Sequence, residues 1–139
     1  MIRAADIQDA ESIADLCAQL EYTISAEEIR PHLQQQRHAE RAIAVHEREG
    51  RVLAWIEVQR RRSLESGEHA EITGLVVDEA ACGKGIGAGL VAWARRWALE
   101  RGFAKLRVRS NEKRAGAHRF YEREGFAHIK SQRVYDTGL

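Results

Sequence analysis

The feature that most constrains this chain is a glycine-rich stretch between an apolar segment and a helix-like one. Residues 82–90 read CGKGIGAGL, and every second residue from 83 to 89 is glycine. The preceding segment, EITGLVVD over residues 71–78, predicts a strand, and the apolar stripe that follows predicts a helix over 85–101. A strand, a glycine loop and a helix in this order are typical of a backbone site for phosphate.

The remaining periodicity predicts one α/β domain, residues 1–139, with a largely antiparallel sheet. We expect strands at 2–5, 41–47, 51–60, 71–78 and 105–110 and one or two within 126–135, and helices at 6–20, 25–36, 85–101 and 115–124. Residues 60–69 read as a polar loop, and Pro31 is expected to kink or divide the second helix. Strand alternation places Glu71, Thr73 and Leu75 on one face and Ile72 and Gly74 on the other.

Composition and charge exclude several classes of function. Apolar residues make up 44% of the 139 residues, charged residues make up 31%, and the formal net charge is +1. This balance indicates a soluble globular protein without the basic excess of a nucleic-acid or membrane-surface binder, and no apolar run is long enough to span a bilayer. Cys17 and Cys82 form neither a CxxC motif nor a metal cluster, so we expect a reducing cytosol and no metal site.

Three interpretations of the glycine loop compete. The P-loop pattern fails because no Lys-Ser/Thr pair follows the glycines. Gly83, Gly85 and Ala88 match the dinucleotide pattern G-x-G-x-x-G/A, but DEAAC separates them from the strand, and LRVRS stands where an acidic ribose-binding residue belongs. In the third interpretation, the backbone N–H groups of residues 83–87 bind an anion at a helix N-terminus.

Residues 75–126 resemble the GNAT superfamily of N-acetyltransferases. The matching text is a strand, GKGIG, a helix, a strand and then N-x(9)-YE-x-x-GF, which runs from Asn111 through Tyr121 to Phe126. Cys82 departs from the family pattern, which usually has Arg or Gln at that position. The resemblance implies a mixed, mostly antiparallel central sheet of about six or seven strands with about four helices, and acetyl-CoA as co-substrate.

The resemblance also implies where acetyl-CoA binds. Pantetheine would lie against the backbone of a strand that splays from its neighbour, and the pyrophosphate would lie on the loop. Asn111 would contact the cofactor or, alternatively, act as a plain helix N-cap. Arg114 or Arg119 would meet the adenosine 3′-phosphate, unless this basic stretch is a solvated face. The implied cofactor residues are Leu75, Val76, Val77, Gly83, Lys84, Gly85, Ile86, Gly87, Asn111 and Arg114.

Direct acetyl transfer to a primary amine requires removal of a proton, because an alkyl ammonium has a pKa near 10.4. Glu71 is the candidate base, directly or through water, with a solvated strand-end charge as the alternative. By the resemblance, Tyr121 is the candidate proton donor to the departing thiolate, with an aromatic packed beside Phe120 as the alternative. Glu57 and His69 are weaker candidates, and His69 is expected in a loop.

The resulting hypothesis is an N-acetyltransferase that acts on the amine of a small molecule. We expect the acceptor between residues 6–36 and the loop near 61–69. An aminoglycoside-type acceptor, a protein N-terminal or lysine acceptor, and a non-catalytic acyl-CoA-binding regulatory module stay open. The resemblance is also compatible with a homodimer that pairs through KSQRVYDTGL, since an exposed edge strand favours pairing.

Overall fold

A computed structural model describes residues 1–36 and 39–139 and contains a mixed five-stranded sheet. The strands follow chain order across the sheet: β1 (Ile2–Ala4), β2 (Arg41–Arg48), β3 (Arg51–Ser63), β4 (Gly67–Val77) and β5 (Leu106–Val108). The first three neighbouring pairs are antiparallel, and β4 and β5 are parallel. The α/β fold class and the mostly antiparallel sheet are confirmed.

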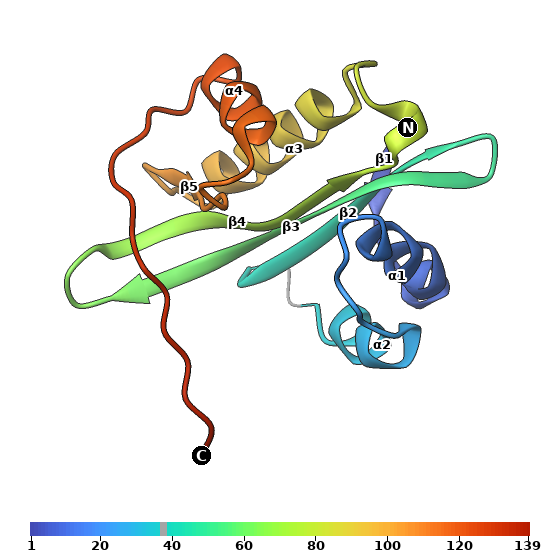
Figure 1. Ribbon diagram of the computed structural model, residues 1–139, viewed down its shortest axis with the longest axis horizontal. Coiled ribbons are helices and arrows are strands. Elements are labelled where there is room, and N and C mark those ends of the chain that lie inside the picture. The colour runs from blue at the N-terminus through green and yellow to red at the C-terminus, as the bar shows by residue number, and fades with distance from the viewer. Residues whose placement is uncertain (37–38) are drawn as a thin grey trace. The chain divides into compact units, whose positions relative to one another are not determined.

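The helices of residues 1–108 cover both faces of this sheet. They are η1 (Ile7–Asp9), α1 (Ala10–Ala18), α2 (Ala26–Gln34), η2 (Glu79–Ala81) and α3 (Ile86–Glu100). Figure 1 shows α1 and α2 on one side of the sheet and α3 on the other. Residues 109–139 form a second compact unit, with α4 (Ala115–Arg123), and we describe it separately. None of the helices described here is long and apolar enough to cross a membrane.

Two sets of buried side chains hold the layers together. Ile43 and Val45 of β2 pack with Ile13, Cys17, Ile29 and Leu33 of α1 and α2. On the opposite face, alternation points Ile56 and Val58 of β3 toward α3, whose Leu90 and Val91 are fully buried. The two faces of β3 thus contribute to two cores, which is typical of a sheet covered by helices on both sides.

Pro31 was expected to kink or to divide the second helix, and it does not divide it. α2 runs without a break from Ala26 to Gln34 and begins with the predicted capping box of Ser25 and Glu28. Proline removes a single backbone hydrogen bond within the helix. Burial of Ile29 and Leu33 against α1 offsets this loss, so the short helix continues through the proline.

The predicted polar loop over 60–69 is wrong, because most of it belongs to strands. β3 extends to Ser63 and β4 begins at Gly67, so only Leu64–Ser66 turn. Arg60 forms ion pairs with Glu68 on β4 and with Glu40 before β2. Opposite charges that face each other across a ladder stabilise strand pairing, even where the sequence is too polar to read as a strand.

The predicted strands within 126–135 are absent from the described structure, so the sheet has five strands rather than six or seven. The run from Lys130 to Arg133 interrupts the apolar alternation that a half-buried strand needs. Ile129 and Val134 are accordingly 67% and 87% exposed. The segment buries too little apolar surface to offset the entropy of ordering a strand.

A β-bulge at Thr73 overturns the predicted faces of β4. Gly74 pairs with Glu57, and Ile72 pairs with Val58, so Thr73 is an extra residue in the ladder. After the bulge the alternation reverses. Glu71 therefore shares a face with Gly74 rather than with Leu75, and the wide ring of Trp55 from β3 packs over Gly74 on that face.

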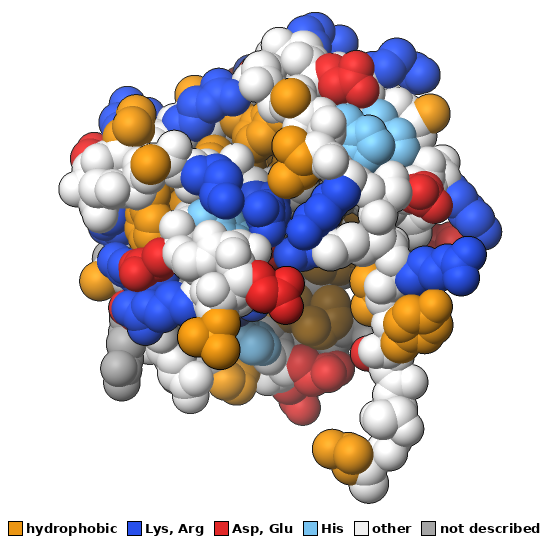
Figure 2. All heavy atoms as spheres, turned by 90° about the vertical axis from the view of Figure 1, so that its left-hand side faces the viewer, with side chains coloured by type: hydrophobic (Ala, Val, Ile, Leu, Met, Phe, Trp, Pro, Cys, Tyr) orange, Lys and Arg blue, Asp and Glu red, His pale blue; other side chains and the backbone are white. Residues whose placement is uncertain are grey.

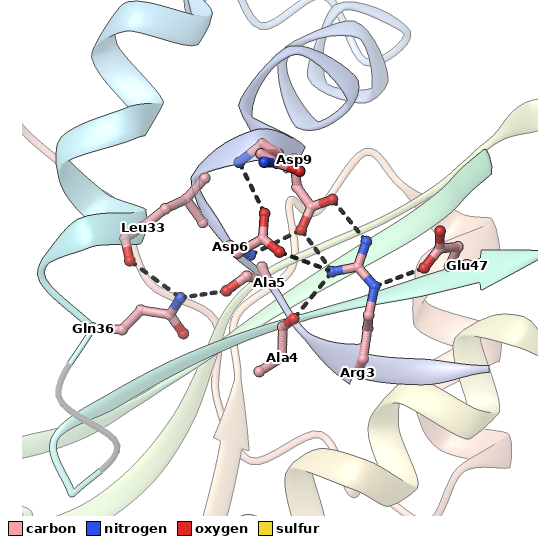
Figure 3. Close-up of polar contacts among 9 residues, drawn as sticks. Arg3, Ala4, Ala5, Asp6, Asp9, Leu33, Gln36 and Glu47 are labelled. Atoms are coloured by element: carbon pink, nitrogen blue, oxygen red, sulfur yellow. Dashed lines mark hydrogen bonds and ion pairs between the residues drawn. The ribbon is translucent and has the colours of Figure 1, made fainter. Parts of the chain in front are cut away.

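Arg3 joins β1 to η1 and to β2 through charged hydrogen bonds (Figure 3). Its two Nη atoms lie 2.8 and 2.9 Å from the oxygens of Asp9, and its Nε donates to Glu47 at 2.7 Å. Asp9 also accepts from the Asp6 N–H at 2.8 Å and is only 5% exposed. Burial alone would raise the pKa of Asp9, but the hydrogen bonds from Arg3 and Asp6 and the charge of Arg3 lower it below the usual value.

We predict that Arg3→Gln lowers the free energy of unfolding by about 2–4 kcal/mol, because it leaves the buried Asp9 carboxylate without its counter-ion. Urea unfolding followed by circular dichroism measures this change. Arg30→Gln is the matched control, since Arg30 pairs with Glu11 at 3.7 Å on the surface and should contribute less than about 1 kcal/mol. Equal effects of the two substitutions would contradict the role of Arg3.

The same carboxylate predicts how stability depends on pH. Because the pKa of Asp9 is lower in the folded than in the unfolded chain, its contribution is present above the unfolded value, about 3.9, and is lost as the pH falls through the folded value. Asp9→Asn should therefore remove part of the loss of stability that the wild-type protein shows on acidification. Parallel stability curves of the two proteins below about pH 5 would contradict this assignment.

Candidate functional site

The parallel strands β4 and β5 separate partway along β4. Ala70, Glu71 and Ile72 pair with Leu106, Arg107 and Val108, and β5 ends there while β4 continues to Val77. From Thr73 to Val77, the edge of β4 that faces away from β3 has no β5 partner within the described chain. Backbone groups on such an edge can pair with an extended ligand as they would with a strand. Leu75, Val76 and Val77, predicted from the sequence, lie on this edge.

The glycine loop carries the chain from the end of β4 into α3. Gly83 and Gly85 have φ values of +80° and +79°, in the left-handed region where a side chain is strained. Gly85 is the N-cap of α3, and the N–H of Gly89 bonds back to its carbonyl at 3.0 Å. The earlier N–H groups of the helix, including those of Ile86 and Gly87, have no acceptor within the helix and are available to an anion.

The segment before the loop is held by a hydrogen bond within itself and by one to Gln19, the C-cap of α1. The Asp78 carboxylate accepts from the Ala80 N–H at 2.8 Å, and the Glu79 N–H donates to Gln19 Oε1 at 3.0 Å. Cys82, at the position that departs from the family pattern, donates from Sγ to the Asp78 carbonyl at 3.4 Å. A shallow cavity of about 280 Å³ lies here, and Lys84 lines it together with Arg48, Glu49, Arg51, Leu53, Asp78, Ala80 and Ala81.

Glu71 is a buried carboxylate at the point where β4 and β5 are about to separate. It is 2% exposed, so the alternative of a solvated strand-end charge is wrong. His69 Nε2 lies 3.1 Å from one carboxylate oxygen, and Arg61 Nε lies 3.7 Å from the other. His69 is on β4 and is 3% exposed, not in a loop as expected. Because β4 begins at Gly67, His69 and Glu71 are two residues apart on one strand and share a face. This i, i+2 spacing is the sequence signal that could have predicted the pair.

A second polar group surrounds Glu57 on the same face of the sheet. Arg41 lies 2.5 Å from Glu57 Oε2, and the Thr73 hydroxyl donates to Oε1 at 2.6 Å. Gln59 in turn donates to Thr73 Oγ1 at 3.1 Å. Pairing across β2–β5 places these side chains on the face that α1 and α2 cover further along the strands. We call this set the polar half-face: Arg41, Glu57, Gln59, Arg61, His69, Glu71, Thr73 and Arg107.

The remaining predicted site residues belong to the unit of residues 109–139. Asn111 Oδ1 accepts from the Lys113 N–H at 2.9 Å, and Arg114 rather than Asn111 is the N-cap of α4. The interpretation of Asn111 as a plain N-cap is therefore wrong. Its carbonyl lies 2.7 Å from His118 Nε2, so Asn111 ties the turn before α4 to the helix itself.

Tyr121 lies on α4 between two other aromatic rings of its unit. Its ring makes edge-to-face contacts with Phe120 and Phe126, at centroid distances of 5.1 and 5.7 Å. Burial raises the pKa of the Tyr121 hydroxyl, and the positive charge of Arg114 lowers it only in part. The phenol is therefore protonated at neutral pH and able to donate a proton. The packing alternative is therefore present in the structure.

The face of the molecule that Figure 2 shows carries charges of both signs, with Asp and Glu side chains among the Lys and Arg side chains. Within the described residues, no group of three or more His, Cys, Asp or Glu side chains is arranged to hold a metal ion. The candidate site consists of the free edge of β4, the loop with the start of α3, and the polar half-face.

Solved structures with the same fold include three informative relatives. A transcriptional regulator from Bacillus halodurans C-125 is 25% identical, with a TM-score of 0.82 over 97% of this chain and 99% of its own. An aminoglycoside N-acetyltransferase in complex with CoA is 18% identical, with a TM-score of 0.82 over 100% of both chains. The glucosamine-6-phosphate N-acetyltransferase of Arabidopsis thaliana is 23% identical, with a TM-score of 0.81 over 99% and 98%.

A comparison with curated proteins finds no significant match. The sequence profile of the acetyltransferase (GNAT) family, in contrast, matches residues 7–126. This match spans β2 to β5, the glycine loop, α3 and α4, which are the elements that carry the site features described above. The chain belongs to the GNAT family of acetyltransferases.

Proposed function

We propose that the chain is an N-acetyltransferase that moves the acetyl group of acetyl-CoA directly to a primary amine of a small molecule. The observation that carries this proposal is the separation of β4 from β5 after Ile72, one residue beyond the buried Glu71. The separation leaves one edge of β4 free. Glu71 lies just before this free edge, and the glycine loop, the proposed phosphate site, follows the end of the strand. A thioester and an amine can meet between these three features.

The described residues fit CoA. The free edge at Leu75, Val76 and Val77 offers backbone groups to the amides of pantetheine. A Cβ added at Gly83 or Gly85 would meet nothing within 4 Å, so phosphate oxygens have space to approach the loop backbone. Gly83–Gly87, with the Lys84 ammonium, would hold the pyrophosphate. Asn111 and Arg114 are assigned to the cofactor by the family pattern, with the 3′-phosphate as the partner of Arg114.

Each catalytic role is assigned to a group with suitable chemistry. When bound, acetyl-CoA supplies an activated acyl carbonyl and a thiolate leaving group. Glu71 accepts the proton of the amine, directly or through water, and His69 holds its carboxylate in place at 3.1 Å. Tyr121 donates a proton to the sulfur, which its raised pKa permits across the neutral range.

The polar half-face is the proposed acceptor site. A small polar amine suits a surface of carboxylates and guanidinium groups better than an apolar amine does, because an apolar amine would leave these groups without polar partners. The aminoglycoside and glucosamine-6-phosphate enzymes with this fold act on small amines, whereas a protein N-terminus or lysine is the alternative acceptor. A non-catalytic acyl-CoA-binding regulatory module is the second candidate, because the relative at 25% identity is a transcriptional regulator. A homodimer through residues 130–139 stays a prediction.

One pair of measurements separates these functions. We expect CoA to raise the melting temperature of the protein, and acetyl-CoA to be consumed in the presence of some members of a panel of small amines. Thermal shift and thiol release detect the two effects. Stabilisation without turnover on small amines or peptides would favour the regulatory module, and no stabilisation by CoA would exclude the proposal.

We predict that Gly85→Val abolishes CoA binding without unfolding the chain. A β-branched residue at φ +79° strains the backbone by about 1–2 kcal/mol and places methyl groups where the pyrophosphate approaches. Gly102→Val is the matched control, since Gly102 has φ +80° and equal open space but lies after α3. Isothermal titration calorimetry should show loss of CoA binding only in Gly85→Val, and unchanged affinity would refute this assignment of the loop.

We predict that Tyr121→Phe lowers kcat about 10–100-fold, less than many general acids contribute, because a thiolate is a fair leaving group without protonation. Since the pKa of Tyr121 is raised, the phenol keeps its proton at both about pH 7 and about pH 9, and the loss should be equal at both. Tyr135→Phe, at an 80% exposed tyrosine, should leave kcat unchanged. A loss that disappears by pH 9 would show that Tyr121 is not the proton donor.

A further inference from the structure

The polar half-face carries more guanidinium groups than carboxylates. Arg41 is paired with Glu57 at 2.5 Å, and Arg61 lies 3.7 Å from Glu71. Arg107 differs from both, because its Nε is buried and has no hydrogen-bond partner among the described residues. Buried donors of this kind are uncommon in native proteins, and a ligand can supply the acceptor that the described chain does not.

Arg107 lies beside Glu71, so a ligand that binds at Glu71 can also contact Arg107. Arg107 pairs with Glu71 across the parallel ladder of β4 and β5, so the two side chains leave the same face of the sheet. The Glu71 oxygens already face His69 Nε2 and Arg61 Nε, at 3.1 and 3.7 Å. Neighbouring strands lie only about 5 Å apart, so a ligand that touches Glu71 also comes within reach of Arg107.

We propose that the acceptor carries an anionic group close to its amine, and that Arg107 binds this anion while Glu71 receives the amine. The inference rests on the proposed acetyltransferase function and specifies its substrate class. A guanidinium presents two parallel N–H donors to a carboxylate or a phosphate, which suits an amino acid or a phosphorylated amino sugar. The polar half-face has three guanidinium groups and two carboxylates, and both carboxylates are already paired. This positive excess disfavours a polycation such as an aminoglycoside.

The test compares amines that differ only in the anion. Amino acids are measured against their carboxamides, and glucosamine 6-phosphate against glucosamine, so that the two arms separate a carboxylate from a phosphate. Because amidation also changes the pKa of the amine, Kd from calorimetry in the presence of CoA is compared alongside KM. We expect the anionic member of at least one pair to bind about 10–100-fold more tightly to the wild-type protein.

Arg107→Gln should erase this preference by raising KM and Kd for the anionic amine, while those of its neutral partner change less than about twofold. Arg107→Lys should restore part of it, since lysine keeps the charge but not the paired donors. Arg62→Gln is the matched control, because Arg62 projects from the opposite face of β3 and is 65% exposed. It should leave both members of each pair unchanged.

Two results would overturn the inference without touching the proposed function. One is equal or tighter binding of the neutral amines, or of an aminoglycoside, by the wild-type protein. The other is an Arg107→Gln protein that loses the anionic and the neutral amine equally, which would make Arg107 a structural partner of Glu71. Failure of the proposed function itself appears differently, as the absence of stabilisation by CoA, and the calorimetric comparison of the amines is decisive even without turnover.

Discussion

The separation of β4 from β5 after Ile72 is the constraint on which the candidate site depends. β4 is held along its whole length by β3, from the pair of Ser63 and Gly67 to the pair of Ala54 and Val77. Its other edge is held for three residues only. One side of the strand therefore supplies rigidity, and the other leaves backbone donors and acceptors exposed. A strand paired equally on both sides would have no groups to offer a ligand.

The bulge at Thr73 lies at the residue where this separation begins. It reverses the alternation of β4, so that Glu71 and Gly74 share the face of Glu57 and Trp55. Glycine is needed at position 74, because an added Cβ would lie 2.4 Å from the Trp55 ring. Because of the bulge, one face of β4 carries the charged Glu71 before Thr73 and the close contact of Gly74 with Trp55 after it. Bulges next to functional sites commonly re-aim side chains in this way.

The sequence predicted the elements with strong local signals and missed those that depend on partners. The glycine loop, the start of α3 near Gly85, the capping box at Ser25 and the hairpin around Gly50 all follow from local chemistry and were confirmed. The hairpin extension through Arg60–Ser63 and the burial of His69 depend on residues in other strands. A polar run gives no local indication of such pairing, and period-2 alternation cannot reveal a bulge. The strands expected after Phe126 failed for the opposite reason, since their local pattern had no partner.

In the proposed site, backbone groups would hold the cofactor and side chains would hold the acceptor. In the proposed site, the free edge of β4 and the start of α3 would bind the cofactor through N–H and C=O groups, which every residue but proline provides. Cys82 can therefore replace a polar side chain at the head of the loop while Gly83 and Gly85 keep its geometry. Structures that are 18–25% identical share this fold, with TM-scores of 0.81 and 0.82. The polar half-face, the proposed acceptor site, would instead bind through side chains, at positions where two proteins of the same fold are free to differ.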